Sequence, residues 1–356
     1  MRGVWRISFA NGAAIVQTIG KPSKKKTDSS MRIVITGAGG FIGRTLVAEL
    51  LRQSNLVNRL GQPVPIEQIL LVDTYLPTMS DPRIQNLPGS LNEPEILKQI
   101  AEWKPDSVFH LAAILTSAAE LDPAGSLTVN VSALSALVAA ISSRSAPPRL
   151  IFPSSIAVFG GLLPDKVDDD HLQMPQTSYG THKSIAELML ADASRHGLID
   201  ARSLRLPIVL VHPGPPTSSV SDRIAAIVRD CVDGRATVCP LRPDTRVPVV
   251  SVQTVVSNLI RLHNAESAKL IGRRALNQPS LTISMAEIAA SVSRVLDIDP
   301  GSISFVPDPD LKKIVDGWPT GFISTRAAAL GIVSDKNFED IVTAYLKHHE
   351  SKKIAV

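Results

Sequence analysis

The chain has 356 residues, of which 44% are hydrophobic, with a formal net charge of +4 and two cysteines. This length fits one large α/β domain, or such a domain with a small lobe, and the composition suffices for a substantial core. Mixed charges argue against nucleic-acid binding, two cysteines exclude a disulfide framework and favour a reducing cytoplasm, and no apolar run approaches a membrane span in length.

Residues 1–30 differ from the rest of the sequence. They are rich in basic residues and carry no acidic residue before Asp28, whereas a clear strand pattern begins at Met31. We predict a leader or upstream extension that is disordered around Lys24, with Met31 as the natural start. A transit peptide is the alternative interpretation.

A short β-branched strand at residues 32–36 runs directly into a glycine-rich turn. The turn reads Gly37-Ala38-Gly39-Gly40-Phe41-Ile42-Gly43, and a helical pattern follows. Glycines there permit a tight turn and close approach of backbone N–H groups to a pyrophosphate, which the helix N-terminus would face. The strand before and the helix after predict a dinucleotide site at Gly37, Gly40, Phe41, Ile42 and Gly43.

The second predicted strand, at residues 69–73, ends in an acidic residue. A carboxylate at that position accepts hydrogen bonds from ribose hydroxyls and repels a 2′-phosphate, so Asp73 predicts NAD rather than NADP. A turn-capping aspartate is the alternative. The gap between the glycines and Asp73 exceeds the usual length, and we attribute the excess to an insertion rich in turn residues at 55–65.

Strands and helices continue to alternate after Asp73. Further strands are predicted at residues 106–113 and 150–155, and long helices at residues 123–143 and 176–195. This alternation predicts an α/β fold with a Rossmann-type, doubly wound parallel sheet, whose ligand lies at the carboxyl ends of the strands. The third strand closes in Leu111-Ala112-Ala113, where small side chains leave room for the cofactor.

Tyr179 and Lys183 lie one turn apart on the same face of the helix predicted at 176–195. A phenol beside an ammonium can become an unusually acidic tyrosine, although an exposed helix with an ordinary pair is the alternative. Ser155 ends the preceding strand. The topology should bring Ser155, the glycine turn and Asp73 to the same edge of the sheet as this pair, which favours a catalytic centre.

Together these motifs resemble the extended short-chain dehydrogenase/reductase family, the superfamily of NAD-dependent epimerases and dehydratases. The resemblance covers roughly residues 31–345 and includes Asn130 and the segments 36–43, 110–113, 154–160 and 205–207. It implies an NAD-binding domain at 31–212 and, at 213–356, mainly a substrate-binding lobe from which the chain can return to the core sheet. Within the family, the branch of L-threonine, uronate and D-erythronate dehydrogenases is most similar, and the D-erythronate dehydrogenases most of all.

The resemblance also implies roles for individual residues. Tyr179 is expected to be the general base, Lys183 to hold the nicotinamide ribose and favour the phenolate, and Ser155 to orient the substrate hydroxyl. Asn130 is expected either to bind a water at Lys183 or to brace the long helix. Further cofactor contacts are expected from Leu111, Ala112 and Ala113, from Pro207 and Ile208, and from Ser90 and Leu91, with Ser90 replacing an aspartate common in the family.

The implied reaction is NAD-dependent oxidation of a secondary hydroxyl of a sugar acid, D-erythronate to 2-oxo-tetronate (2-dehydro-D-erythronate). Arg246 is the candidate clamp for the substrate carboxylate, because a guanidinium offers a bidentate fork, with a surface salt bridge as the alternative. Arg205 is expected to be a structural ion-pair partner. The alternatives are an L-threonine or uronate dehydrogenase, a nucleotide-sugar epimerase or dehydratase, and an NAD-binding sensor without catalysis.

Other expectations concern metals, mobile loops and assembly. His348 and His349 beside Glu350 are interpreted as a solvated tail, and no spaced His/Asp cluster occurs, so no metal is expected. The loop at 214–219 is expected to be part of a lid. The family also implies a homodimer through the two long core helices at 123–143 and 176–195.

Overall fold

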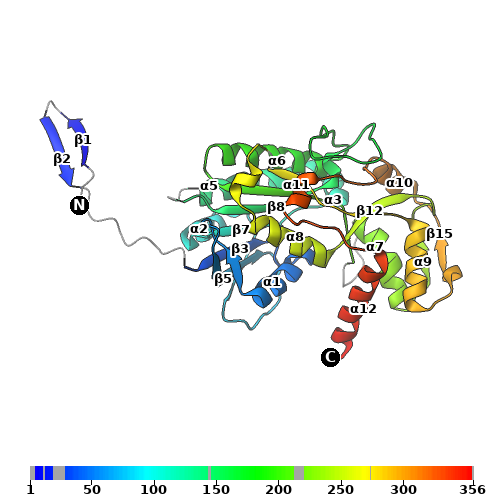
Figure 1. Ribbon diagram of the computed structural model, residues 1–356. Helices are drawn as coiled ribbons and strands as arrows, with labels where there is room; N and C mark the ends of the chain where they lie inside the picture. Colours follow the sequence, from blue (N-terminus) through cyan, green and yellow to red (C-terminus); the bar gives the residue numbers. More distant parts are fainter. Residues whose placement is uncertain are drawn as a thin grey trace.

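The computed structural model describes residues 5–10, 13–18, 29–142, 146–211, 220–272 and 274–354. Two short strands near the N-terminus, β1 (Trp5–Ala10) and β2 (Ala13–Thr18), pair antiparallel with each other (Figure 1). The predicted leader therefore contains some regular backbone structure, while Lys24 lies outside the described residues. The main sheet begins at Met31, where the sequence predicts the fold to start.

The central sheet has eight strands, of which β4 alone pairs antiparallel. The other strands run parallel in the order β6-β5-β3-β7-β8-β9-β13, which confirms the doubly wound parallel sheet. Because the winding reverses between β3 and β7, the ligand crevice lies at their carboxyl ends. The bounds are β3 (Met31–Thr36), β4 (Asn55–Val57), β5 (Pro63–Asp73), β6 (Ile84–Pro88), β7 (Ser107–His110), β8 (Arg149–Ser155), β9 (Asp200–Leu206) and β13 (Ala275–Asn277).

The insertion before Asp73 folds as a β-hairpin rather than as an irregular loop. β4 pairs antiparallel with the first residues of β5, and the Oδ1 atom of Asn58 accepts the N–H groups of Leu60 and Gln62 at 2.9 and 3.0 Å across the turn. The second half of β5 lies in the parallel sheet. The insertion thus lengthens β5 at its amino end and leaves Asp73 at the carboxyl end.

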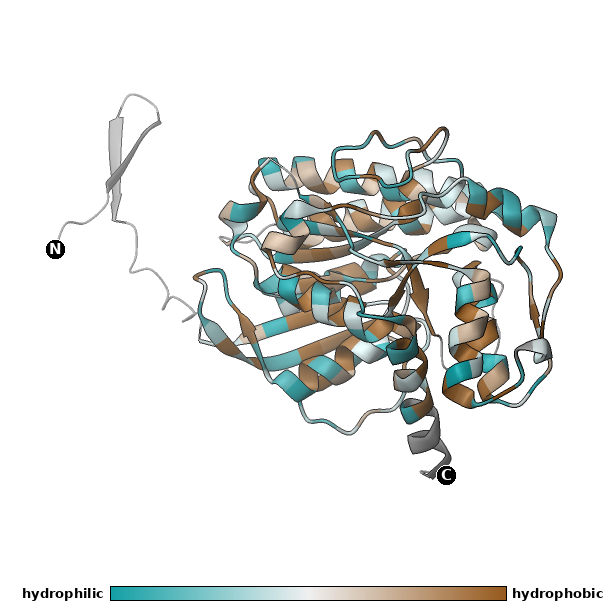
Figure 2. Cartoon of the chain, turned by 45° about the vertical axis from the view of Figure 1, so that its right-hand side comes forward, coloured by the Kyte–Doolittle hydropathy of each residue, from teal (hydrophilic) through white to brown (hydrophobic). Residues whose placement is uncertain are grey.

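Helices cover both faces of the sheet (Figures 1 and 2). α1 (Phe41–Gln53), α8 (Val252–Asn264) and α11 (Thr325–Ala329) pack on one face, and α2 (Pro94–Trp103), α5 (Ala133–Ile141) and α6 (Ser178–Arg195) on the other. Successive residues of a strand contribute their side chains alternately to the two cores, because successive side chains point to opposite faces of the sheet. Ile33, Ile35 and Ile151 belong to the first core, and Val34, Leu150 and Phe152 to the second.

One helical stretch, Pro123–Ile141, is long and apolar enough by composition to cross a membrane, contrary to the expectation from the sequence. It comprises α4 (Pro123–Leu127), a π-helical turn at Thr128–Ser132 and α5, and it follows the short helix α3 (Thr116–Leu121). Core helices of globular proteins pass the same test. Here the leucines and isoleucine of α5 are buried against the sheet, so the stretch is weak evidence for a membrane span.

The C-terminal part builds a second core around a three-stranded sheet in the order β10-β12-β14. The chain leaves this lobe twice to return to the first core, once as the continuous segment from α8 to β13 and once as α11. The bounds are β10 (Ile208–Leu210), α7 (Val220–Val232), β11 (Thr237–Cys239), β12 (Arg246–Ser251), β14 (Leu281–Ser284), α9 (Met285–Leu296), β15 (Ile303–Phe305), α10 (Pro309–Asp316) and α12 (Phe338–Ile354), with 3-10 turns at Ile156–Val158, Ser267–Leu270 and Pro300–Ser302.

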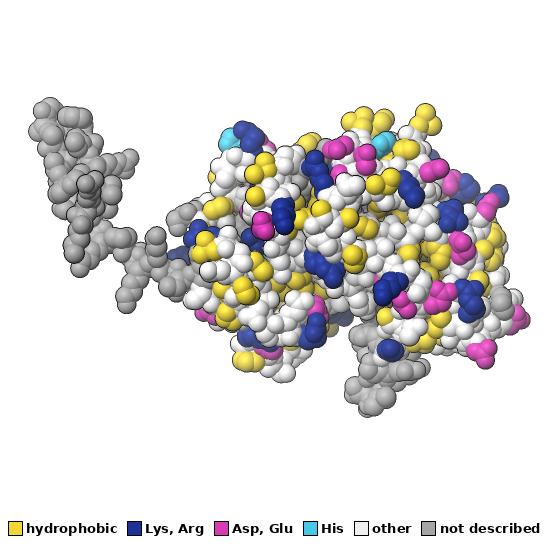
Figure 3. Space-filling view, in the orientation of Figure 1, with side chains coloured by type: hydrophobic (Ala, Val, Ile, Leu, Met, Phe, Trp, Pro, Cys, Tyr) yellow, Lys and Arg dark blue, Asp and Glu magenta, His cyan; other side chains and the backbone are white. Residues whose placement is uncertain are grey.

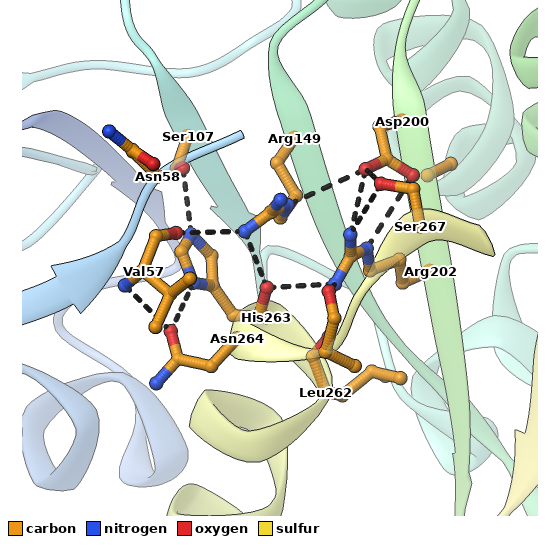
Figure 4. A network of polar contacts seen from close by, with 12 residues as sticks. Val57, Asn58, Ser107, Arg149, Asp200, Arg202, Leu262, His263, Asn264 and Ser267 are labelled. Carbon is orange, nitrogen blue, oxygen red and sulfur yellow. Dashed lines mark hydrogen bonds and ion pairs between the residues drawn. The ribbon is translucent and has the colours of Figure 1, made fainter. Parts of the chain in front are cut away.

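Two buried arginines connect α8 to the amino ends of the strands (Figure 4). Arg149 donates to the carbonyl of His263 at 2.6 Å, and Arg202 donates to the carbonyls of Leu262 and His263 at 2.6 and 2.8 Å. Asp200 accepts from Arg202 at 2.8 Å. The arginines thereby satisfy the last carbonyl groups of α8, which a helix leaves without partners.

Charged side chains of both signs are interspersed on the face shown in Figure 3. Several form short-range pairs, such as Arg52 with Glu49 and Arg242 with Asp244. A broad field of one sign, which nucleic-acid binding requires, is not seen on this face.

Candidate active site

The glycine turn joins β3 to α1. Gly37 has a φ of 70°, in the left-handed region that favours glycine, and its N–H donates to the carbonyl of Val72 at 2.9 Å. A Cβ atom at Gly43 would lie 2.2 Å from the carbonyl oxygen of Gly37, so any side chain there would open the turn. No side chain caps the first N–H groups of α1 at Gly40, which leaves this helix N-terminus suited to a pyrophosphate.

Asp73 ends β5 beside the glycine turn. Its Oδ2 atom accepts a hydrogen bond from the N–H of Gly39 at 3.0 Å. Since β5 neighbours β3 in the sheet, the carboxylate lies where a ribose attached to the pyrophosphate would reach. The position of Asp73 fits the ribose-binding role expected from the sequence.

A cavity of about 290 Å³ opens at the carboxyl ends of the central strands. It extends from the glycine turn at one end to Tyr179 and Lys183 at the other. The structure therefore brings together residues that lie up to 281 positions apart in the chain, counting from Gly37 to Trp318. The predicted site residues that line the cavity are Gly37, Gly40, Phe41, Ile42, Gly43, Leu111, Ala113, Ser155, Tyr179, Lys183, Pro207 and Ile208.

Ser90, Leu91 and Ala112 do not line this cavity. The backbone of Ala112 abuts the glycine turn, where its nitrogen would lie 2.5 Å from a Cβ atom placed on Gly37. Leu91 is buried in the core beneath α2, and the hydroxyl of Ser90 accepts the N–H of Asn92 at 3.2 Å. The contacts expected of Ser90 and Leu91 with the adenine end of the cofactor stay a prediction.

Tyr179 meets Ser155 because α6 begins against the end of β8. Thr177 caps α6 by accepting the N–H of Gly180 at 3.1 Å, and a Cβ atom at Gly180 would lie 2.0 Å from the carbonyl oxygen of Ala157. The absence of that side chain permits the close approach. Ser155 in turn accepts the N–H of Ala157 at 3.1 Å, and its side chain interacts with Tyr179 so as to lower the pKa of the phenol.

Lys183 lies one turn further along α6. It is buried, its Nζ atom donates to the carbonyl of Pro153 at 2.8 Å, and it lies 4.2 Å from the centre of the Phe152 ring. The distance from Nζ to the centre of the Tyr179 ring is 5.6 Å. Tyr179 and Lys183 therefore share one face of the helix, as their spacing predicts, and that face looks onto the cavity.

The two side chains titrate differently from free tyrosine and lysine. Burial raises the pKa of Tyr179 to about 12, and the hydrogen bond with Ser155 acts in the opposite direction. Burial lowers the pKa of Lys183 to about 7, against the charge of Glu187, which raises it. The sequence predicted an acidic tyrosine, and that expectation is wrong for the protein alone, because the penalty of burying a phenolate outweighs the help from its neighbours.

Asn130 occupies the π-helical turn and points toward the strand end rather than toward Lys183. Its Oδ1 atom accepts the N–H of Ile114 at 2.8 Å and its Nδ2 atom donates to the carbonyl of Ile114 at 2.9 Å. The Nδ2 atom also lies 3.4 Å from Nδ1 of His182. Of the two interpretations given for Asn130, the contacts favour bracing, here of the segment that follows β7.

Arg246 lies outside the cavity, which corrects its expected role as the carboxylate clamp. It begins β12 at the surface, where its guanidinium pairs with Glu287 at 3.3 Å and donates to the carbonyl of Thr282 at 3.0 Å. The surface salt bridge, named as the alternative, is what the structure shows. Arg205, by contrast, is buried in an ion pair with Glu187 at 2.8 Å, which confirms the structural role expected of it.

Several lining residues were not predicted from the sequence. Thr116 and Leu115 follow β7, Ser221 begins α7, and Trp318 comes from the connection after α10. Ser154 also lines the cavity, and its buried hydroxyl has no hydrogen-bond partner among the described residues. No local pattern marks Ser221 and Trp318, because they join the site only when the second lobe folds over the first. Leu115, Thr116 and Ser154 lie in the first lobe, at the carboxyl ends of β7 and β8.

Among the described residues, no group of three His, Cys, Asp or Glu side chains is placed to hold a metal ion. The side chains of His348, His349 and Glu350, and the loop at 214–219 that was expected to be part of a lid, lie outside the described residues. Cys231 and Cys239 are both free and buried.

Comparison with known proteins places the site in a family context. Residues 33–273 match the model of the NAD dependent epimerase/dehydratase family. D-erythronate dehydrogenase of Cupriavidus necator is 36% identical over 89% of the chain and 98% of the relative, and that of Haemophilus influenzae is 32% identical over 89% and 99%. The crystal structure of a nucleoside-diphosphate-sugar epimerase from Agrobacterium tumefaciens superimposes with a TM-score of 0.83 at 30% identity, covering 92% and 98% of the chains.

Proposed function

The chain belongs to the NAD-dependent epimerase/dehydratase family, and on this basis we propose that it oxidises D-erythronate at C2 to 2-oxo-tetronate with NAD. It is an NAD-dependent oxidoreductase that acts on CH–OH groups, of the kind that oxidises alcohols and sugar acids. One observation supports the proposed reaction. Tyr179, Ser155, Lys183 and the glycine turn all line one cavity.

The residues of the cavity fit NAD. The glycine turn and the N-terminus of α1 would bind the pyrophosphate, and Asp73 would accept hydrogen bonds from the adenosine ribose. Leu111 and Ala113 form one wall of the cavity, and Pro207 with Ile208 lies on another part of it. These walls are apolar and suit the flat nicotinamide ring, which accepts a hydride at C4 when bound.

Tyr179 would remove the proton of the substrate hydroxyl while the hydride leaves the same carbon. Ser155 would donate to that oxygen and hold it near Tyr179 as the carbonyl forms. The ammonium of Lys183, beneath Tyr179, would stabilise the phenolate and bind the nicotinamide ribose. A bound oxidised nicotinamide is positively charged, and it would act in the same direction.

The acid end of the substrate requires donors other than Arg246. Lys183 is the one Lys or Arg side chain in the described lining of the cavity, and it donates to the backbone. We place the substrate carboxylate and hydroxyls beside Thr116 and Ser221, which line the cavity from opposite lobes. Neutral donors in this position suit a small polyhydroxy acid, which offers many acceptors for hydrogen bonds.

A screen of NAD reduction tests the proposal. The purified protein is mixed with NAD and, separately, with D-erythronate, other aldonic acids, uronic acids and L-threonine, and NADH is followed by absorbance. We expect the highest kcat/KM with D-erythronate. No NADH with any of these acids would overturn the proposed reaction.

The structural neighbour supports a second candidate. The Agrobacterium protein of 30% identity is described as a nucleoside-diphosphate-sugar epimerase, so UDP- and GDP-sugars belong in the screen. Conversion of a nucleotide sugar without net NADH formation would establish that alternative. Phe159, where epimerases of this family usually carry a tyrosine before the glycine, counts against it.

A homodimer is part of the proposal. The outward faces of α3, α4 and α6 expose large aliphatic side chains, namely Leu121, Leu127, Ile185 and Leu188. These helices contact one another, so the four side chains belong to one side of the molecule. Burying them against a second copy would remove apolar surface from water. The two free cysteines also agree with the proposed cytoplasmic location.

A further inference from the structure

His110 ends β7 as a fully buried side chain, 1% exposed, beneath the proposed active site. Its Nδ1 atom lies 2.8 Å from the hydroxyl of Thr36, and its ring stacks on Phe152 with centres 6.0 Å apart. Its Nε2 atom is buried and has no hydrogen-bond partner among the described residues. Native proteins rarely leave a buried polar nitrogen in this state, so Nε2 calls for a partner.

Lys183 contacts the same aromatic ring as His110. Its ammonium lies 4.2 Å from the centre of the same Phe152 ring, and its one hydrogen bond in the described structure goes to Pro153, the next residue of β8. The charge of Lys183 reaches the imidazole. Burial first, and Lys183 second, lower the pKa of His110 to about 3, so the ring is neutral at every pH at which the enzyme would work.

The charge of Lys183 favours one tautomer of His110. The hydroxyl of Thr36 lies 2.8 Å from Nδ1 and also accepts the N–H of Ala112 at 3.5 Å. With the proton on Nδ1, His110 donates to Thr36 and Nε2 keeps a lone pair. A lone pair next to an ammonium is favourable, whereas an N–H group in that place would be repelled.

We propose that His110 is a positioning residue for Lys183, and that its Nε2 accepts a hydrogen bond from the Lys183 ammonium through one ordered water. Nε2 and Nζ make no direct hydrogen bond in the described structure, and buried water commonly joins such unsatisfied groups. His110 then stabilises the charged form of a lysine that burial would otherwise neutralise. This inference rests on the proposed role of Lys183 in binding the cofactor.

The other groups that act on Lys183 are known from the packing. Tyr179 and Glu187 lie on the same helix, His110 faces it from β7, and Arg205 on β9 neutralises Glu187. Removing the acceptor at His110 should lower the pKa of Lys183. Because the ammonium would bind the nicotinamide ribose, the affinity for NADH should then weaken at a lower pH than in the wild type.

The test is the pH dependence of NADH affinity, measured by fluorescence titration between about pH 6 and pH 10. His110→Phe keeps the ring and loses both nitrogens, His110→Asn keeps a group near Thr36, and His110→Gln restores a polar atom near the position of Nε2. We expect the pH at which the Kd rises to fall by about one unit in the first two variants. The glutamine variant should move it back toward the wild type.

His263 provides a matched control. It too is fully buried, its ring centre lies 5.5 Å from that of Phe109 in a stacked arrangement, and its pKa is lowered to about 3, chiefly by burial. In contrast to His110, it lies beside Ser107 at the amino ends of the strands. His263→Phe should lower thermal stability and leave the pH dependence of NADH affinity unchanged. A wild-type profile in both His110→Phe and His110→Asn overturns the inference, as does the same shift in His263→Phe.

Two further measurements separate the inference from the proposed function. Lys183→Met should weaken NADH binding and abolish turnover. Full activity in that variant would remove the proposed function, whereas an inactive Lys183→Met beside wild-type profiles in the His110 variants would remove only the role of His110. If the His110 variants do not fold, nitrogen NMR of the wild type decides, because the inference requires an unprotonated Nε2 in His110 at neutral pH.

Discussion

The pKa values of Tyr179 and Lys183 are both shifted in the direction that favours the neutral side chain. The pKa of Tyr179 is raised to about 12 and that of Lys183 is lowered to about 7, in both cases chiefly because burial disfavours the ionised form. A positive charge that enters the cavity would favour the phenolate of Tyr179, and the phenolate would in turn favour the ammonium of Lys183. The oxidised nicotinamide carries such a charge and the reduced form does not, so this arrangement favours proton removal in the oxidative direction.

Replacement of Tyr179 by phenylalanine tests the proposed base. We expect kcat with D-erythronate to fall by roughly 10²- to 10⁴-fold, the range typical of general acid–base catalysis, with NADH affinity changed little. Steady-state kinetics and fluorescence titration provide the two measurements. Tyr345→Phe, in the second lobe, serves as the control and should keep wild-type kcat. A Tyr179→Phe enzyme of full activity would assign the base to another group.

Asp73 should decide between NAD and NADP. Asp73→Asn removes the negative charge, so the affinity for NAD should fall roughly 10- to 100-fold, as expected when a hydrogen bond to a charged group is lost. Repulsion of the 2′-phosphate disappears as well, which narrows the preference for NAD. Comparison of kcat/KM with both cofactors measures the change. Glu67→Gln removes an exposed acid on the same strand and should leave the preference for NAD over NADP unchanged. The same result in Asp73→Asn would contradict the role of Asp73 in binding the ribose.

The candidate site residues that could be identified from the sequence share one property. A single helix or a single turn determines their positions relative to one another. The spacing of Tyr179 and Lys183 within one helix survives folding, and the glycine turn carries its own strand and helix. Arg246 was assigned from its chemistry and its place in the C-terminal portion alone, and its strand directs it to the surface. Trp318 reaches the cavity only through the packing of two lobes, which no local pattern encodes.

At the scale of elements, the end of α8 depends on the buried arginines at the amino ends of the strands (Figure 4). Arg202 is wholly buried and binds three carbonyl groups, those of Leu262, His263 and Ala265. Arg202→Met would remove this donor from the carbonyls of Leu262 and Ala265. The carbonyl of His263 would keep Arg149, and Asp200 would keep Arg274 but lose its second-closest arginine pair. We expect the free energy of unfolding to fall by about 3–5 kcal/mol, as for other broken buried pairs, measured by urea denaturation.

Arg195→Met is the control for Arg202→Met. Arg195 pairs with Asp192 at 2.7 Å at the surface, and exposed pairs contribute only about 0–1 kcal/mol. A loss below about 1 kcal/mol in Arg202→Met as well would show that its buried contacts do not stabilise the fold.

The same network gives stability a dependence on pH. Burial alone would raise the pKa of Asp200, but the charge of Arg202 and hydrogen bonds from Arg202, Ser267 and Arg274 hold it well below its usual range. A lowered carboxylate pKa contributes stability that is present above the unfolded pKa, near about 4, and is lost as the pH falls toward the folded value. In Arg202→Met, the part of the free energy of unfolding that is lost on acidification should be smaller than in the wild type.

Element boundaries were predicted well where periodicity is local and poorly where pairing is distant. The alternation of strands and helices predicts the parallel sheet, since each βα unit carries its own pattern. The hairpin β4–β5 has the composition of a turn in the sequence. In the second sheet, β10 pairs with β12 across 41 residues, from Ile208 to Val249, and β12 pairs with β14 across 32 to 38 residues. Strands as short as β10 have too few residues to show a period of two.

At the scale of the whole molecule, the chain crosses more than once between two hydrophobic cores. α8 and β13 come from the C-terminal part of the sequence and pack in the first core, so the lobes are connected by more than one segment. The active-site cavity takes its lining from both lobes. This arrangement explains why a division of the chain at residue 212 does not describe the packing of the two cores.

The proposed homodimer gives the prediction at this scale. Leu188 is 70% exposed on α6 among the aliphatic side chains of α3, α4 and α6, and a charge placed there would have to be buried in a dimer. We expect Leu188→Glu to convert the dimer into a monomer, with the mass measured by light scattering after gel filtration. Val306→Glu is the matched control, because Val306 is 61% exposed in the second lobe and should leave the dimer intact. A wild-type protein that is monomeric at micromolar concentration would contradict the proposal, and dissociation by both variants would move the interface away from α6.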